Sequence, residues 1–295
     1  MRRSLIAVAP VAALLLAACG SSTSSSTSAA SSSSTPESTS ASASATCSPT
    51  SMQTLTPGKF TVATGNPAFS PWVIDDKPES GKGFESAVTY AVAKQLGYTD
   101  ADVVWMRTGF DEAIAPGPKK FDVNIQQFTI SEDRKKAVDF SSGYYDLTQA
   151  VVTYKGSPIE KATSLAALKE ARLGAAVGTT SLDAITASIQ PTTAPKVYNN
   201  NDDAVAALKA KQIDGLVVDL PTAFYIAFGE LDNGVLIGQL PNSADQKEQL
   251  GFLLAKGSPL TQCVTQAVDA LRADGTLAKL QDQWLSASAG APVLS

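Results

Sequence analysis

The chain has 295 residues, of which 44% are hydrophobic and 17% are charged, enough apolar material for a packed core in one or two domains. It contains no histidine, which excludes Ser-His-Asp and Cys-His catalysis and histidine ligands for a metal. The 28 acidic residues outnumber the 23 basic ones, so the net charge of −5 argues against nucleic acid as a partner, because phosphates are held by clustered Lys and Arg.

Residues 1–18 have the pattern of a secretory signal. Two arginines precede an apolar run that is shorter than the roughly 20 residues needed to span a bilayer. The run ends at Leu-Ala-Ala-Cys-Gly around Cys19, which resembles the lipobox of bacterial lipoproteins. That resemblance implies cleavage before Cys19 and a lipid on its thiol, so that the protein is anchored to the outer face of the cell membrane. The alternative is an uncleaved membrane anchor with an incidental cysteine.

The next segment is compositionally biased. Residues 20–46 are almost wholly Ser, Thr and Ala and contain no aromatic or branched aliphatic side chain. Such a segment cannot bury enough surface to offset its ordering entropy, so we expect residues 19–52 to form a disordered tether. A tethered domain suits a binding protein that passes cargo to a membrane partner, and it suits a surface enzyme equally well.

From residue 53 the chain alternates short strands and helices. The helix after Gly83 has apolar residues at four-residue spacing and ends at Gly97. In this first part, strands are expected at 59–64, 102–106, 121–125 and 150–154, and a short helix at 111–115. The alternation favours sheets with parallel character that are covered by helices on both faces.

The same pattern restarts near residue 161. Strands are expected at 172–177, 196–198 and 215–218, and helices at 164–170, 182–189, 202–210, 221–228, 259–273 and 275–285. Two α/β units of about 100 residues each favour two lobes rather than one large sheet.

A series of short motifs carries a family resemblance. The motifs are Gly83-Phe84-Glu85, Phe121-Asp122-Val123, Thr129-Ile130-Ser131-Glu132-Asp133-Arg134, Val138-Asp139-Phe140-Ser141, Gly178-Thr179-Thr180, Ile213-Asp214-Gly215 and Asp274-Gly275-Thr276-Leu277. Their order and spacing resemble the amino-acid-binding, family-3 extracellular solute-binding proteins of ABC importers, over about residues 59–285. The resemblance implies an α/β, two-lobed periplasmic-binding-protein-like (type II) fold, with two crossing segments and a cleft that holds one free amino acid.

The resemblance also implies a division of the chain and a function. Lobe 1 is expected to comprise residues 53–150 and a return segment at 249–288, and lobe 2 to comprise residues 151–248, followed by a tail at 289–295. The implied function is capture of an amino acid and its delivery to an ABC permease by a monomeric lipoprotein that is not an enzyme and needs no cofactor.

Two interpretations of Arg134 are possible, a solvent-exposed residue or a ligand-binding one. Locally, Ser131 would cap a helix whose first turn carries two acids, and Arg134 would point into water. In the family, the arginine at this motif position grips the α-carboxylate of the ligand. A guanidinium suits that task because it pairs with a carboxylate through two hydrogen bonds and stays charged.

Two lobe 2 motifs have the same ambiguity. In the turn Gly178-Thr179-Thr180, Thr180 or Ser181 could simply cap the following helix. The backbone N–H groups of the turn, with the hydroxyl of Thr179 or Thr180, could instead bind the ligand carboxylate. Asp219 ends an apolar strand, where α/β proteins place ligand groups, although it could instead cap the helix before Pro221. By resemblance, Asp219 pairs with the α-ammonium group.

The side-chain subsite is less well defined. By resemblance, Phe69 and Phe110 are rings that line the ligand side chain, although either could be an ordinary core residue. Thr129 aligns with a hydroxyl that contacts the ligand amino group. Asn66 stands where binders of basic amino acids usually carry an acid, which favours a polar or acidic amino acid over Arg, Lys or His.

The three cysteines, Cys19, Cys47 and Cys263, are too scattered for a structural zinc site, and no metal site is expected. Outside the cytoplasm, a disulfide is the default for Cys47 and Cys263, with two free thiols as the alternative. The bridge would pin the end of the tether to lobe 1.

Two other functional classes remain open at this stage. An extracytoplasmic enzyme on the same fold, resembling the cyclohexadienyl dehydratases, would need a cleft carboxylate as general acid beside the arginine. Glu85 comes too early in its predicted helix to be a confident candidate. A sensory or adhesive surface domain is the third class, for which the chain offers no attached kinase, receptor or wall-binding segment.

Overall fold

The computed structural model describes residues 47–241, 248–286 and 290–295. The predicted signal, the lipidation site Cys19 and most of the predicted tether lie outside the described residues. No helix in the described part of the chain combines the length and the apolar character needed to cross a membrane.

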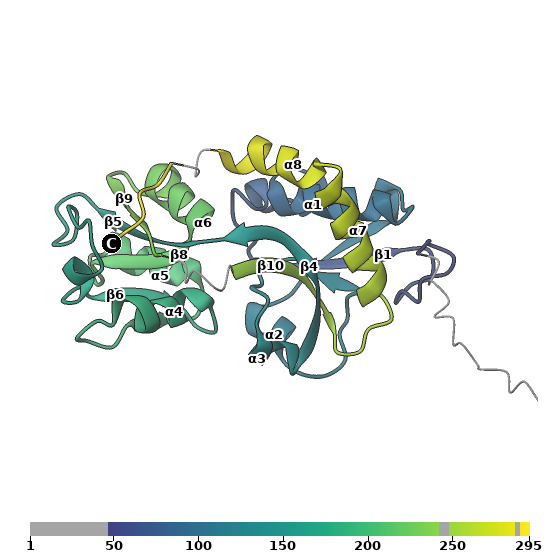
Figure 1. Cartoon of the computed structure of the whole chain (residues 1–295), viewed down its shortest axis with the longest axis horizontal. Helices are drawn as coiled ribbons and strands as arrows, with labels where there is room; N and C mark the ends of the chain where they lie inside the picture. Colours follow the sequence, from purple (N-terminus) through teal and green to yellow (C-terminus); the bar gives the residue numbers. More distant parts are fainter. Residues whose placement is uncertain (1–46, 242–247, 287–289) are drawn as a thin grey trace, which may run out of the picture. The chain divides into compact units, whose positions relative to one another are not determined.

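Lobe 1 is built on a mixed sheet of five strands in the order β2-β1-β3-β10-β4 (Figure 1). The strands are β1 (Phe60–Thr64), β2 (Val103–Arg107), β3 (Val123–Asn124), β4 (Val138–Leu147) and β10 (Glu248–Ala255). β1 pairs in parallel with β2 and β3, whereas β10 runs antiparallel to both β3 and β4. The carboxyl ends of β1 and β3 therefore meet at one edge of the sheet, and the loops that follow them begin there.

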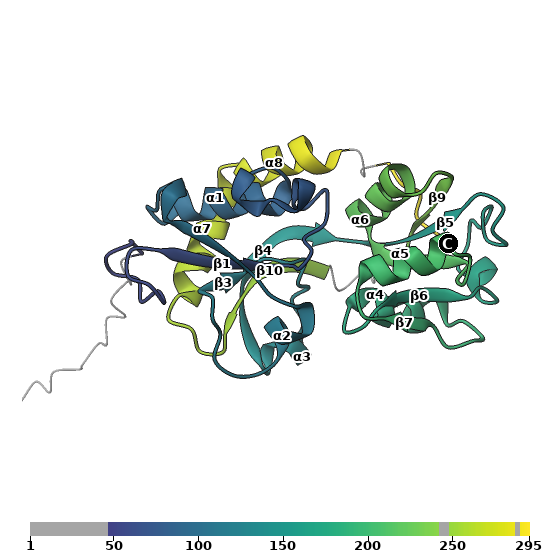
Figure 2. The same cartoon turned by 180° about the vertical axis from the view of Figure 1, so that it is seen from behind.

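Helices cover both faces of this sheet. The helical segments of lobe 1 are α1 (Phe84–Gln95), α2 (Phe110–Ile114), α3 (Glu132–Lys135), α7 (Thr261–Ala273), α8 (Thr276–Leu285), and the short η1 (Ile74–Asp76), η2 (Pro78–Ser80) and η3 (Asp100–Asp102). In both views α1, α7 and α8 lie together (Figures 1 and 2). Phe60 and Val62 pack under these three helices, whereas Ala63 packs on the opposite face with α2, as the alternation along a strand requires.

Lobe 2 has its own five-stranded sheet, in the order β7-β6-β8-β5-β9. Its elements are β5 (Gln149–Tyr154), β6 (Leu173–Ala176), β7 (Lys196–Tyr198), β8 (Gly215–Asp219), β9 (Gly234–Gln239), α4 (Thr180–Ala184), α5 (Asn201–Lys209), α6 (Leu220–Tyr225), and the segments η4 (Ala166–Leu168), η5 (Ile185–Ile189) and η6 (Ile226–Glu230). Leu216 and Val218 face α5 and α6, while Val217 faces η5. The core of lobe 2 is thus divided between the two faces of its sheet.

The chain passes between the two sheets more often than the family resemblance implies. It leaves the lobe 1 sheet after β4 and enters the lobe 2 sheet with β5, and it returns to the lobe 1 sheet with β10. After α8, Val293 forms a parallel bridge with Gln239, and Leu294 is buried in the lobe 2 core. The predicted tail is therefore attached to lobe 2, and the chain enters lobe 2 a second time.

Several predicted elements differ from those observed. The strand expected at 121–125 is reduced to the two residues of β3, and the helix expected at 164–170 is only the short η4. β4, β9 and β10 were not predicted, and they make the sheets mixed rather than mainly parallel. A strand that returns from the other lobe pairs antiparallel with its neighbour, and the local alternation of helices and strands gives no sign of this.

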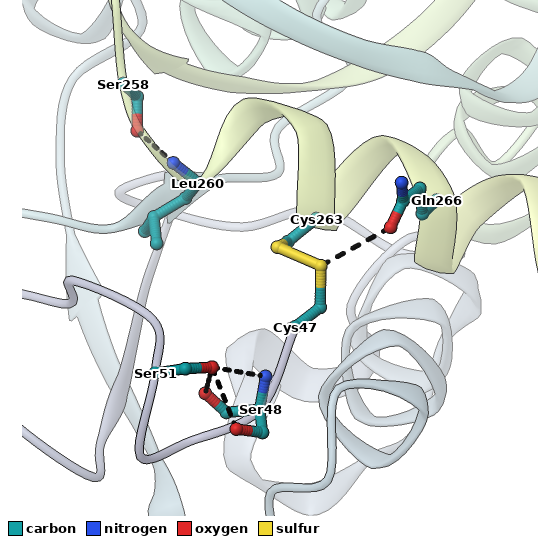
Figure 3. Close-up of a disulfide and its surroundings, with 7 residues drawn as sticks. All are labelled: Cys47, Ser48, Ser51, Ser258, Leu260, Cys263 and Gln266. Carbon is teal, nitrogen blue, oxygen red and sulfur yellow. Dashed lines mark hydrogen bonds between the residues drawn. A yellow bond between two sulfur atoms is a disulfide. The ribbon is translucent and has the colours of Figure 1, made fainter. Parts of the chain in front are cut away.

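A disulfide joins Cys47 to Cys263, with 5.4 Å between the two Cα atoms, in the part of the chain shown in Figure 3. Cys263 is buried in α7, so the bridge attaches the chain before β1 to lobe 1. Residues 47–52 were predicted to be disordered. Instead, the backbone N–H of Met52 donates to the carbonyl of Ser48, and the Met52 side chain is buried in the lobe 1 core. This part of the tether prediction is wrong, because the disulfide and Met52 hold the segment on lobe 1.

Candidate functional site

A cavity of about 310 Å³ lies between the lobes. Its lining includes all eight of the predicted ligand-binding residues: Asn66, Phe69, Phe110, Thr129, Arg134, Thr179, Thr180 and Asp219. Residues up to Arg134 come from lobe 1, and the others come from lobe 2. The fold therefore brings together side chains that are widely separated in the sequence.

Arg134 is held in the cavity wall by contacts with both lobes. It lies in α3, which begins after Ser131, whose hydroxyl accepts the Arg134 N–H. Nη1 donates to the carbonyl of Thr129 (2.8 Å), and Nη2 donates to the carbonyl of Gly178 on lobe 2 (2.9 Å). Burial lowers the pKa of Arg134, but three acids oppose this effect: Asp183, Asp219 and Glu248. The guanidinium stays charged, so it can pair with an anion in the cavity.

The turn between β6 and α4 forms the facing wall. Thr179 is the N-cap of α4: its hydroxyl accepts the N–H of Leu182 and donates to the carbonyl of Ala176 (2.8 Å). The hydroxyl of Thr180 instead lies 3.1 Å from that of Thr129, across the cleft. The cap predicted at Thr180 or Ser181 is therefore wrong, because the helix begins one residue earlier and Thr179 caps it. Thr180 is the threonine whose hydroxyl reaches the other lobe.

Asp219 lies at the end of β8 and is partly buried. Its Oδ1 accepts a hydrogen bond from the amide of Gln149 (3.2 Å), and its side chain makes no capping bond to α6. Burial raises the pKa of Asp219 to about 7. The negative charges of Glu248 and Glu85 act in the same direction, whereas the Gln149 bond and Arg134 lower it. A carboxylate in such surroundings gains most from a cation that enters the cavity.

The sequence left open whether Phe69 and Phe110 line the cavity or belong to the core, and Phe110 does both. Phe110 lines the cavity, and its ring also stacks on Phe128, with 4.6 Å between the centroids. The Arg134 guanidinium lies over the ring of Phe110, with its central carbon 5.4 Å from the ring centroid. Phe69 is partly buried in the cavity wall, and Asn66 is exposed beside it.

Other residues of the site were not nominated from the sequence. The cavity lining also contains Asp111, Glu112, Gln126, Gln127, Ser181 and Asn199–Asn201. The asparagine run was detectable, because it directly follows the predicted strand at 196–198, at the sheet edge where ligands bind. Asp111 and Glu112 have no comparable signal, since an exposed first turn of a helix is ordinarily acidic.

Glu85 is fully buried behind the cavity and does not line it. Its carboxylate accepts hydrogen bonds from the backbone and side-chain N–H groups of Gln127 and from the hydroxyl of Tyr144. Gln127 has a left-handed backbone, with φ of 50°, and Glu85 fixes it in that conformation. Burial raises the pKa of Glu85 to about 7 despite these bonds. The buried acid therefore shapes the cavity floor from behind.

The charges of the cavity suit a small zwitterion. The guanidinium of Arg134 and the carboxylate of Asp219 belong to different lobes and line one cavity. An α-carboxylate beside the first and an α-ammonium beside the second would satisfy both charges. Among the described residues there is no group of three or more acidic or cysteine side chains arranged to hold a metal ion.

The sequence profile of the bacterial extracellular solute-binding proteins, family 3, matches residues 60–287. The L-arginine-binding protein of Pseudomonas aeruginosa is 27% identical over 226 residues, which cover 74% of this chain and 85% of that protein. The L-cystine-binding protein TcyJ of Escherichia coli K12 is 28% identical over 209 residues, covering 70% of this chain and 74% of the relative. The glutamine-binding protein GlnH of Bacillus subtilis is 27% identical, with coverages of 70% and 75%.

Solved structures show the same fold. An ancestral arginine-binding protein bound to glutamine has a TM-score of 0.64 and 30% identity, covering 78% of this chain and 99% of its own. An ancestral amino-acid-binding protein described as a precursor of cyclohexadienyl dehydratase has a TM-score of 0.62 and 28% identity, with coverages of 77% and 94%. Both resemblances extend across the two lobes.

Proposed function

Since this chain belongs to the bacterial extracellular solute-binding proteins, family 3, we propose that it captures one free amino acid in the cavity between its lobes and delivers it to an ABC permease. The observation that carries this proposal is the placement of Arg134 and Asp219, from different lobes, in the wall of one cavity. A molecule with both an α-carboxylate and an α-ammonium group can bridge these charges, whereas a molecule with only one of them leaves a buried charge unpaired.

The side-chain class follows from the remaining lining. Within the part of the chain that the structure describes, Arg134 is the one lysine or arginine that lines the cavity, whereas Asn66, Gln126, Gln127 and the asparagines at 199–201 supply amides. Of the polar and acidic amino acids, a neutral polar one fits better, because an acidic side chain would face Asp111 and Glu112 without a cation. We infer a polar, uncharged amino acid such as L-glutamine.

The proposed location is the outer face of the cell membrane, to which a lipid on Cys19 would anchor a monomeric protein. The sequence motif around Cys19 supports this, and the disulfide at Cys47 attaches the chain after the tether to lobe 1. A permease would then meet a domain that stays close to the membrane.

A thermal-shift screen of the twenty amino acids, followed by calorimetry of the best one, tests this function. We expect neutral polar amino acids, with L-glutamine among the first, to raise the melting temperature most. A response confined to L-arginine or L-lysine would overturn the side-chain class and keep the function. No response to any amino acid would overturn the function itself.

The enzyme alternative has one argument in its favour, the similarity to the precursor of cyclohexadienyl dehydratase. However, Glu85 cannot act as its general acid, because its carboxylate is buried away from the cavity and is bonded to Gln127 and Tyr144. Incubation with prephenate or arogenate, with detection of an aromatic product, separates the two functions.

A further inference from the structure

Gln149 joins the cavity to the strands that connect the lobes. It is the first residue of β5, directly after the crossing from β4, and it is 4% exposed. Its amide nitrogen lies 3.2 Å from each of three oxygen atoms, which belong to Thr180, Asp219 and Glu248. Glu248 is the first residue of β10, the strand that returns to lobe 1. One side chain therefore contacts the proposed ammonium partner and both connecting strands.

The orientation of the Gln149 amide is fixed by its neighbours. Ionised carboxylates only accept hydrogen bonds, so the NH₂ end must face Asp219 and Glu248. The carbonyl end accepts the hydroxyl of Ser181 at 2.7 Å. The Gln149 amide therefore orients the Asp219 carboxylate, and it keeps the negative charge of Glu248 close to that carboxylate.

Glu248 does not line the cavity, so it acts on a ligand only through its neighbours. Its charge acts on two of the groups that do line the cavity: it opposes the lowering of the Arg134 pKa, and it raises the pKa of Asp219. The other groups facing Asp219 are Glu85 from α1, Arg134 from α3, and Tyr144 and Tyr145 from β4. Of these, only Arg134 carries a positive charge, so the surroundings of Asp219 favour an incoming cation.

We propose that Glu248 is a positioning residue of the amino-group subsite, which acts on Asp219 through the side chain of Gln149. The inference rests on the proposed function. The negative charge of Glu248 increases the attraction of the subsite for an ammonium group, and Gln149 keeps the two carboxylates apart and aligned. The carboxylates of Asp219 and Glu248, joined by the Gln149 amide, would thus both attract the ammonium group of the ligand.

The test is the pH dependence of amino-acid binding to Glu248→Gln, measured by calorimetry from pH 5 to pH 8.5. The probe is L-glutamine, or L-arginine if the screen favours it. Binding needs ionised Asp219, and its pKa of about 7 in the wild type predicts that affinity falls as the pH drops below 7. Removing the charge of Glu248 lowers the pKa of Asp219. At pH 8 we expect roughly three- to tenfold weaker binding, because the attraction of the Glu248 charge for the ammonium group is lost. The lower pKa of Asp219 should move the acid decline in affinity down by roughly half a pH unit or more.

A merely structural role of Glu248 predicts a different result, a loss of affinity that is equal at every pH. That outcome would overturn the proposal, as would a variant that matches the wild type in both affinity and pH profile. Glu170→Gln is the matched control, because Glu170 is exposed on lobe 2, does not line the cavity, and accepts a hydrogen bond from the hydroxyl of Thr192. If the wild type binds no amino acid at any pH, the proposed function fails together with the inference.

The role of Gln149 is tested by a double-mutant cycle. Gln149→Met removes the amide at similar size, and its melting temperature shows whether it folds. If Gln149 transmits the effect, adding Glu248→Gln to Gln149→Met weakens binding less than Glu248→Gln does alone. Losses that multiply would show that the two residues act independently, which would overturn the mediated part of the proposal. Glu248→Gln alone still tests the remainder if Gln149→Met does not fold.

Discussion

The two lobes contribute to the cavity in different ways. Lobe 1 offers groups that its own contacts already hold: Arg134 bonds to the carbonyl of Thr129 and lies on Phe110, which stacks on Phe128. Lobe 2 offers a backbone turn and one carboxylate, and the orienting contacts of Thr180 and Asp219 come from Thr129 and Gln149 at the junction. Lobe 1 thus holds Arg134 largely through its own contacts, although Arg134 also donates to Gly178. On lobe 2, the Thr180 hydroxyl contacts Thr129 of lobe 1, and Asp219 is oriented by Gln149, the residue with which the chain enters the lobe 2 sheet.

This difference implies an order of events. Under the proposed function, the ligand carboxylate would meet Arg134 on lobe 1 first, and Asp219 would reach the ammonium group when lobe 2 closes. Outside the cleft, the lobes are also joined by the indole N–H of Trp72, which donates to the hydroxyl of Thr222 at 2.7 Å. Loss of a lobe 1 group should therefore remove binding, and loss of a lobe 2 group should weaken it.

Arg134→Ala should have the largest effect. It leaves the ligand carboxylate unpaired and removes the bond from lobe 1 to the carbonyl of Gly178, so we expect affinity to fall by roughly a thousandfold or more. Arg134→Lys is the matched variant: it keeps the charge but lacks the planar pair of N–H donors that matches both oxygens of a carboxylate, and it should restore little. Calorimetry with the amino acid from the screen measures both. Near-native affinity of the alanine variant would remove Arg134 from the site.

Asp219→Asn should have an intermediate effect. The amide keeps the shape of the carboxylate but cannot balance the ammonium charge, which typically costs a few kcal/mol, or on the order of a hundredfold in affinity. Its binding should also depend less on pH between 6 and 8, because one of the two buried acids with a pKa of about 7 is gone, the one that lines the cavity. A loss below tenfold would mean that Asp219 acts only as the residue before α6, and lobe 2 would then contribute backbone alone.

Alanine at Thr180 should have the smallest effect on binding. The Thr180 hydroxyl contacts Thr129 and Gln149 across the junction, and losing one such bond weakens binding by roughly fivefold. Thr179→Ala removes the N-cap of α4 and should lower the melting temperature more than the affinity. If the double variant bound as tightly as the wild type, the turn would act through its backbone only.

Local sequence patterns predicted the elements that alternate between strand and helix. α1 begins after Gly83 and ends before Gly97, as expected, because its apolar spacing and its glycines are local signals. β4, β9 and β10 gave no such signal: β10 pairs with β3 and β4, over a hundred positions away, and lobe 2 lies between them in the chain. Pairing of distant segments is not encoded in a short window of sequence.

The site divides in the same way. Arg134 and Asp219 could be nominated from the sequence because they lie where a helix starts and a strand ends, and both line the cavity. Gln149 and Glu248 were not nominated, because the contact between them forms only in the folded chain and neither residue lies in a recognisable motif. Asp214 illustrates the converse: it belongs to a motif, yet it pairs with Arg172 at 2.6 Å and holds the start of β6 rather than a ligand.

The attachment of residues 290–295 to lobe 2 has a practical consequence. The carbonyl of Ser295 accepts the N–H of Leu165, so the chain terminus moves with lobe 2, while the disulfide makes Ser48 move with lobe 1. A donor dye next to one and an acceptor dye next to the other would report the approach of the lobes as a change in energy transfer. Positions beside Ser48 and Ser295 thus suit labels for a sensor of ligand capture, without alteration of the cavity.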